Sequence, residues 1–236
     1  MPSRKFRQFL ADSAASIPIF LAIFAISPEV LAGAYEEILF FAEKGDTQSV
    51  VALLQKGMDV NTSDRTGTTL LMIAARAGNL NLLETLLRNR ANILKYNKYG
   101  EDALTLAAFA GNMEIVQRLI ESGAEIQNPR WGALHYAAYQ GHASVVRYLL
   151  QHGANVDSKA PNGQTALMLA SQNNHEAVAD ILLTSGADVS VRDPQGHSAA
   201  DLAEKAGNSR LAERIANLTV KPASPLASPP ETARGS

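Results

Sequence analysis

Residues 69–78 read TLLMIAARAG, and residues 102–111 read DALTLAAFAG. Each stretch begins with a Thr or Asp, whose side chain can accept a hydrogen bond from a free backbone N–H in the first turn of a helix. Each ends in Gly, which adopts the left-handed conformation that closes a helix. The paired alanines between these ends let two helices approach closely. Both stretches therefore predict short, tightly packed helices with defined ends.

The same short helix recurs along the chain and ends at residues 45, 78, 111, 141, 174 and 207, at intervals of 33 residues except for one interval of 30. A second marker, a Leu pair followed by Gly-Ala, keeps this period. It is found, with small variations, at Leu53-Leu54, Leu86-Leu87, Leu119-Ile120, Leu149-Leu150 and Leu182-Leu183. A unit of this size cannot bury two helices alone, so neighbouring units must stack to form the core. The sequence therefore predicts a helical solenoid.

A period of about 33 residues with the motif Thr-Pro-Leu-His-x-Ala is typical of ankyrin repeats. The chain resembles this family at residues 69–74, 133–138 and 165–170, although the Pro of the motif is absent throughout. The resemblance covers residues 35–217. It implies an all-α ankyrin-repeat solenoid of about five to six helix-turn-helix repeats with short hairpin loops. It also implies a non-enzymatic function in binding another protein.

Several positions depart from the repeat pattern. The connection between Ala124 and Leu134 is three residues short, which predicts a truncated hairpin, and Gly132 replaces the capping Thr there. Arg90 stands where Gly is preferred, so we expect local strain. The resemblance implies that His135 forms hydrogen bonds to loops. The residues predicted to cap the second helices are Asp46, Asn79, Asn112, His142, His175 and Asn208.

The N-terminal segment has the features of a secretory signal peptide. Arg4, Lys5 and Arg7 form a positive region, an apolar run extends from residue 17 to residue 26, and Ala32-Gly33-Ala34 supplies small residues for cleavage. We expect cleavage after Ala34, with Ala32 as an alternative site. An uncleaved anchor is the other interpretation, although the apolar run is about half the length needed to span a bilayer. Either way, the body of the chain is expected in the periplasm or outside the cell.

The predicted domains are a signal peptide (1–34), an ankyrin-repeat domain (35–217) and a Pro/Ser/Ala-rich disordered tail (218–236). The formal net charge is −2, and the body of the chain has no basic stripe that would favour the binding of nucleic acid. There is no cysteine, no His pair with metal-ligand spacing and no Gly-rich phosphate loop. We therefore predict no catalytic residues, no metal and no cofactor, and we expect a monomer with no membrane insertion after cleavage.

In ankyrin proteins, partners usually dock on the concave face, which is formed by the hairpin tips and the exposed positions of the first helices. Carried over to this chain, the predicted partner-binding residues are Arg65, Arg76, Lys98, Tyr99, Phe109, Arg130, Trp131, Tyr139, Gln140 and Gln172. The aromatic residues among them suggest an interaction patch, because Tyr and Trp are typical binding hot spots. The alternative for Trp131 is that it folds inward to fill the space left by the short hairpin.

The partner's identity and the biological role remain open in the sequence. A periplasmic or secreted binding module is one interpretation. An inhibitor or immunity-type protein that masks an envelope toxin or hydrolase would share the same fold. An enzyme would need a catalytic group outside the repeats, and the tail offers none.

Overall fold

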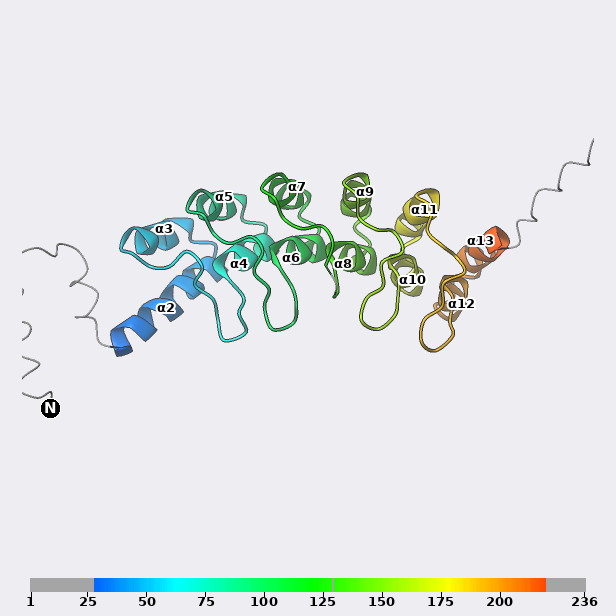
Figure 1. Ribbon diagram of the computed structural model, residues 1–236, viewed down its shortest axis with the longest axis horizontal. Helices are drawn as coiled ribbons and strands as arrows, with labels where there is room; N and C mark the ends of the chain where they lie inside the picture. The colour runs from blue at the N-terminus through cyan, green and yellow to red at the C-terminus, as the bar shows by residue number, and fades with distance from the viewer. Residues whose placement is uncertain (1–27, 129, 220–236) are drawn as a thin grey trace, which may run out of the picture.

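The computed structural model describes residues 28–128 and 130–219, and these residues form two parallel rows of helices (Figure 1). The first helices of the repeats are α2 (Pro28–Glu43), α4 (Leu70–Ala77), α6 (Ala103–Ala110), α8 (Ala133–Gln140), α10 (Ala166–Gln172) and α12 (Ala199–Lys205). The second helices are α3 (Thr47–Gln55), α5 (Leu80–Arg88), α7 (Met113–Glu121), α9 (Ala143–Gln151), α11 (Glu176–Thr184) and α13 (Ser209–Thr219). Hairpins project to one side from the row of first helices. This arrangement confirms the predicted all-α solenoid.

The first helices begin and end as their sequences predict. The hydroxyl of Thr69 accepts a hydrogen bond from the backbone N–H of Met72, and the carboxylate of Asp102 accepts one from Thr105. Thr165 and Ser198 cap α10 and α12 in the same way. At the C-terminal ends, glycines such as Gly111 have a φ of 72°, in the left-handed region that suits a residue without a Cβ.

A single apolar core runs through the whole stack. In α4, the six residues Leu70 to Ala75 are all buried, because this helix packs against α2, α5 and α6. A second helix buries only one stripe, which in α7 consists of Ile115, Val116 and Leu119. Each repeat therefore depends on its neighbours for most of its buried surface, as expected of a solenoid.

Of the six residues predicted to cap the second helices, three do so and three do not. Asp46, Asn79 and Asn208 each accept a hydrogen bond from a backbone N–H of the helix that follows, as predicted. The prediction is wrong for Asn112, His142 and His175, whose side chains make no capping bond.

These three side chains instead bond to the preceding repeat. Asn112 Nδ2 donates to the carbonyl of Ala75 at 3.0 Å, and Nε2 of His142 lies 3.0 Å from the carbonyl of Phe109. His175 Nε2 lies 2.9 Å from the carbonyl of Tyr139. The last carbonyls of a helix have no partner within that helix, so a donor on the next repeat satisfies them. The result is a row of hydrogen bonds that joins successive repeats.

His135 compensates for the missing capping side chain of Gly132. Its Nδ1 accepts a hydrogen bond from the backbone N–H of Gly132 at 3.2 Å, and its Nε2 lies 2.9 Å from the carbonyl of Ser158 in the next hairpin. The ring is only 1% exposed. Burial lowers the pKa of His135, and the bond to Ser158 opposes this shift only in part. The neutral ring thus links the start of α8 to the following loop.

Most of the hairpins are shaped by one Asp or Asn side chain that bonds to the backbone of the turn. Asn97 Oδ1 accepts the backbone N–H groups of Tyr99 and Glu101, and Asp193 Oδ1 does the same for Gln195 and His197. In the shortened hairpin, Asn128 Oδ1 accepts the backbone N–H of Arg130, and its Nδ2 donates to the carbonyl of Gly100. The truncated hairpin therefore keeps the turn and remains tied to the hairpin before it.

Arg90 shows the predicted strain, because its φ of 62° lies in the left-handed region. Its side chain is exposed, and the backbone strain of an L-residue there costs roughly 1–2 kcal/mol. We expect Arg90→Gly to raise the free energy of unfolding by about 1 kcal/mol, measured by urea denaturation. Arg88→Gly, in the last turn of α5, is the control and should be destabilising, since glycine disfavours a helix. A neutral or destabilising Arg90→Gly would contradict the strain.

Ser171 introduces a buried hydroxyl into the helix-packing surface of α10. It is fully buried, and within the described part of the chain its Oγ has no hydrogen-bond partner. Ala75, Ala108 and Ala138 occupy the equivalent position in other repeats. We expect Ser171→Ala to raise the free energy of unfolding by about 1 kcal/mol, because it removes an unsatisfied polar group. Thermal denaturation would show this as a higher Tm, and an unchanged or lower Tm would contradict it.

The described residues begin inside the predicted signal segment. Helix α2 starts at Pro28, a residue that suits the first turn of a helix, and it continues through Ala34 and Tyr35. The positive region, the apolar run and almost all of the predicted tail lie outside the described residues, so cleavage and disorder stay predictions. Within residues 28–128 and 130–219, no helix has the length and apolar character needed to cross a membrane.

Candidate protein-binding face

An aromatic cluster lies at the centre of the predicted concave face. The ring of Tyr136 on α8 is contacted edge-on by Phe109 of α6, with centroids 5.6 Å apart, and by Trp131 at 5.4 Å. Tyr139 follows Tyr136 by three residues and therefore lies on the same side of α8. Three of the four predicted aromatic residues thus come together around Tyr136.

Trp131 combines both of the orientations considered for it. Its ring packs on Tyr136 and also contacts His135, with centroids 6.2 Å apart, yet the residue remains half-buried. The ring therefore packs at the start of α8 while the residue stays partly accessible to solvent.

The other aromatic rings are exposed to different degrees. Tyr99, at the tip of its hairpin, is 62% exposed, and Lys98 places its ammonium group 5.0 Å from the centroid of the Tyr99 ring. Tyr139 is 42% exposed and Phe109 is 36% exposed. Large apolar rings held in solvent on adjacent repeats form the kind of surface that marks a protein interaction site.

Tyr136 and Glu101 were missed by the sequence analysis. The Tyr136 hydroxyl donates to Glu101 Oε1 at 3.1 Å, and Asn97 Nδ2 donates to Glu101 Oε2 at 2.9 Å. Burial and the neighbouring Glu101 carboxylate raise the pKa of Tyr136 to about 12, so its hydroxyl remains protonated. Tyr136 occupies the variable position (x) of the Leu-His-x-Ala motif. An aromatic residue at this position, beside Phe109 and Trp131, was the sequence signal by which Tyr136 could have been predicted to belong to the cluster.

The predicted cations surround this cluster. Arg65, Arg76 and Lys98 are exposed, and none of them forms an ion pair with another described residue. Arg130 is also exposed, but its stem lies across Gly100, where an added Cβ would approach Arg130 Cδ to 2.2 Å. The ion pairs with an Arg side chain are elsewhere: Arg118 with Glu84 and Glu121, Arg192 with Asp201, and Arg214 with Asp180.

Two glutamines complete the predicted set. Gln172 on α10 is exposed, and its Oε1 accepts a hydrogen bond from Gln164 Nε2 of the adjacent hairpin at 3.1 Å. Gln140, at the end of α8, is also exposed. Neither residue takes part in the ring contacts of the aromatic cluster, so they form a polar border toward the C-terminal repeats.

Two hollows lie beside this face. The shortened hairpin borders a cavity of about 320 Å³ lined by Tyr96, Asn97, Gly100, Glu125, Asn128 and Arg130. Another hollow, of about 450 Å³, is lined by Glu43, Ile73, Arg76 and Ala77. Two of the predicted cations, Arg130 and Arg76, therefore stand at the walls of surface depressions.

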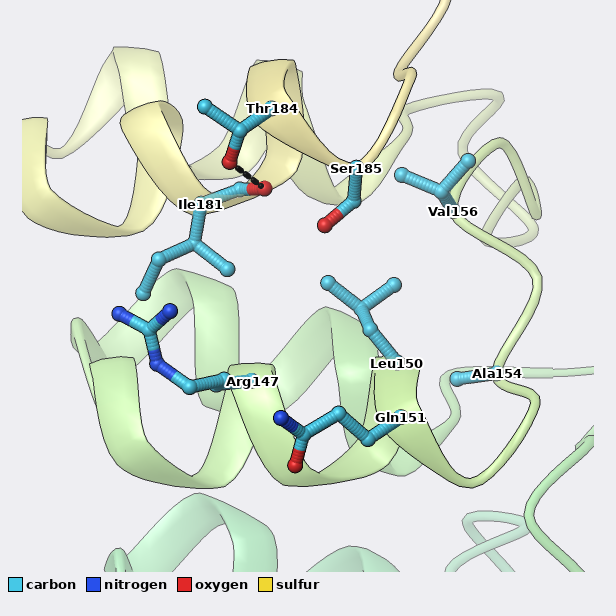
Figure 2. Close-up of a pocket in the computed structure, with 8 residues that line it drawn as sticks. All are labelled: Arg147, Leu150, Gln151, Ala154, Val156, Ile181, Thr184 and Ser185. Atoms are coloured by element: carbon cyan, nitrogen blue, oxygen red, sulfur yellow. Dashed lines mark hydrogen bonds between the residues drawn. The ribbon is translucent and has the colours of Figure 1, made fainter.

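A further cavity of about 320 Å³ lies between the second helices α9 and α11 (Figure 2). Leu150, Val156 and Ile181 supply its apolar lining, Arg147 stands beside Ile181, and Thr184 uses its hydroxyl to donate to the Ile181 carbonyl. None of the predicted partner-binding residues lines it.

The histidines are engaged in the fold. Besides His135, His142 and His175, the ring of His152 bonds to the carbonyl of Tyr148, and His197 contacts the carboxylate of Asp193. Within the described ranges, no group of three His, Asp or Glu side chains is arranged to hold a metal ion.

The comparisons with known proteins agree with this architecture. A family model for three copies of the ankyrin repeat matches residues 38–130 and 126–193, about two thirds of the chain. A search of curated proteins finds no match. Stacked helix pairs, projecting hairpins and this match lead to the same conclusion: the chain belongs to the ankyrin-repeat family, whose domains generally act as protein–protein interaction modules and are typically non-enzymatic.

Proposed function

We propose that this protein is an exported, non-enzymatic module that binds a partner protein on its concave face. The observation that carries the proposal is the aromatic surface of two adjacent repeats, where Tyr99, Phe109 and Tyr139 are exposed. Rings fixed in position by a rigid scaffold can bury a large apolar area with little loss of conformational entropy. The surface lies on the side of the repeats where ankyrin domains generally bind other proteins.

The proposed export depends on the N-terminal segment. Its order of positive, apolar and small residues is typical of a signal peptide. N-terminal sequencing of the protein recovered from the extracytoplasmic fraction tests this. A chain that begins at Tyr35, or at Gly33, would support cleavage, whereas an intact N-terminus in the membrane fraction would support the anchor. Recovery only from the cytoplasm would contradict export.

The binding proposal is tested by crosslinked capture from the cell-envelope fraction. The informative variant is Tyr99→Ala/Tyr139→Ala, because both rings are exposed. Trp131 is kept, since its ring packs on His135 and Tyr136. The matched control is Leu94→Ala/Leu218→Ala, which removes two exposed apolar side chains from the loop after α5 and from α13. Circular dichroism should show that all three proteins are folded.

The proposal expects one protein to be captured by the wild type and by the control, and to be lost with Tyr99→Ala/Tyr139→Ala. Capture that survives this variant would place the binding surface elsewhere. A tight one-to-one complex that silences an enzymatic or toxic activity of the captured protein would identify the inhibitor role. Absence of any specific capture would contradict the binding module.

A further inference from the structure

The partner's chemistry can be inferred from the charges around the aromatic cluster. We infer that the concave face binds a short, extended, acidic segment of the partner protein, with an apolar side chain at its centre. This inference rests on the proposed function and adds the class of ligand that the face selects.

The cations of this face form no close ion pairs within the described residues. Arg65, Arg76 and Lys98 are exposed, and no ion pair joins them to any carboxylate in the described ranges. Lys98 contacts the ring of Tyr99 and acts through its charge on Asp64, but no carboxylate oxygen of the described residues lies within ion-pair distance of its ammonium group. Cations held at the border of an apolar cluster attract a negatively charged segment and fix its position.

Two of the carboxylates close to these cations are already bonded. Asp64 accepts hydrogen bonds from Thr66 and Thr68 within its hairpin. Partial burial raises the pKa of Asp64, but these bonds and the charge of Lys98 outweigh burial and lower it. Glu101 accepts from Asn97 and Tyr136. Glu43 lines the same hollow as Arg76 and makes no ion pair with it. Asp64 and Glu101 are therefore committed to hydrogen bonds within the fold, whereas Glu43 faces solvent like the bases.

The apolar part of the segment has a defined place. Phe109 on α6, Tyr136 on α8 and Trp131 in the shortened hairpin form a continuous ring surface, and Tyr139 lies beside it. Arg65 and Arg76 lie on the hairpin before α4 and on α4 itself, Lys98 lies on the hairpin before α6, and Arg130 lies on the shortened hairpin before α8. Stacked helices are about 10 Å apart, so three adjacent repeats span roughly 20 Å. An extended segment of about six residues covers that distance.

A protein segment fits this face better than a nucleic acid. The chain has a formal net charge of −2, and Glu101 holds a carboxylate directly beside the aromatic cluster. A phosphate backbone, with one charge on every nucleotide, would be repelled at that point. An acidic peptide can place an uncharged residue there and its carboxylates near the surrounding cations.

The test uses the purified protein and a displayed library of random peptides. The peptides are about 12 residues long, which is twice the number of residues estimated to cover the face. We expect the enriched peptides to carry net negative charge around an apolar residue. For a synthetic copy of the strongest peptide, Arg65→Glu/Arg76→Glu/Lys98→Glu should lower the association rate at low salt by about tenfold or more. Added salt should reduce this difference between wild type and variant.

The matched control is Lys56→Glu/Arg88→Glu/Arg147→Glu, which reverses three exposed cations that belong to the second helices or follow them. Both triple variants change the net charge equally and both reverse one Arg in the last turn of a helix, Arg76 or Arg88. The control should change the association rate by less than about twofold, because its charges lie away from the aromatic cluster.

The possible outcomes separate the two proposals. Enriched peptides that are neutral or basic, yet lose binding with Tyr99→Ala/Tyr139→Ala, would overturn the acidic ligand and leave the binding face intact. Peptides unaffected by that aromatic variant, or failure to enrich any peptide, would overturn both. Tighter binding of a single-stranded oligonucleotide than of the acidic peptide would also overturn the inference.

Discussion

Gly141→Ala is expected to lower the free energy of unfolding by about 3 kcal/mol. Gly141 ends α8 with a φ of 81°, and an L-residue in this left-handed conformation costs roughly 1–2 kcal/mol. A Cβ at this position would also lie 2.5 Å from Nδ1 of His175. The ring would have to move, and its bond to the Tyr139 carbonyl would be lost at a further cost of about 1 kcal/mol.

Gly207→Ala is the matched control for this prediction. Gly207 occupies the same position of the last repeat with a φ of 79°, and a Cβ there would meet no atom within 4 Å. Its substitution therefore adds the backbone cost alone, roughly 1–2 kcal/mol. Urea denaturation followed by circular dichroism measures both. If the two variants lose the same free energy of unfolding, contact with the next repeat is not the reason for glycine at position 141.

This comparison concerns the coupling between repeats. In a solenoid, stability is roughly the sum of the stabilities of single repeats and the interfaces between neighbours. The bonds from Asn112, His142 and His175 cross three successive interfaces, and each ends on a carbonyl near the C-terminus of the preceding first helix. Weakening one of them should lower cooperativity as well as stability, so the denaturation curve of Gly141→Ala is expected to broaden.

The fold was predictable because its signals are local and repeated. The polar cap, the alanine pair and the terminal glycine act within one helix, and their period of 33 residues fixes how the units follow each other. Thr69 and Asp102 cap their helices as the sequence indicates, and Arg90 has the positive φ expected at a glycine position.

The contacts between repeats were harder to predict. A polar residue such as His142 at the start of a helix has two sets of partners, the backbone N–H groups ahead of it and the carbonyls of the preceding repeat. Local rules consider only the first set. The imidazole of His142 reaches the carbonyl of Phe109, 33 residues earlier in the chain, and this choice depends on how the helices stack.

The candidate face was predicted in part for a similar reason. The exposed positions of Tyr99, Phe109 and Tyr139 follow from their places in the repeat, and the structure shows these rings in solvent. Glu101 and Tyr136 were missed because their importance comes from a contact between two neighbouring repeats. That contact places a bonded carboxylate within a basic surface, and this feature led to the inference of an acidic protein ligand rather than a nucleic acid.

His135→Ala is expected to lower the free energy of unfolding by about 3 kcal/mol. It leaves the N–H of Gly132 and the carbonyl of Ser158 without their side-chain partner in a buried site, and each unsatisfied group costs roughly 1–3 kcal/mol. It also removes the ring against which Trp131 packs. His135→Gln should cost less, because a Gln side chain at this position can still accept the N–H at the start of the helix.

The stability of the wild type should also fall as the pH decreases from 7.5 to 5.5, and His135→Gln should remove part of this dependence. Burial holds the pKa of His135 below its usual value of about 6.5, so the unfolded chain takes up a proton in this range before the folded chain does. Stability is therefore lost as the pH falls below about 6.5, at no more than about 1.4 kcal/mol per pH unit from this group. Because the other histidines are present in both proteins, the difference between their urea denaturation curves isolates His135. Equal pH dependence in the two proteins would mean that the buried ring binds its proton as readily in the folded state as in the unfolded state.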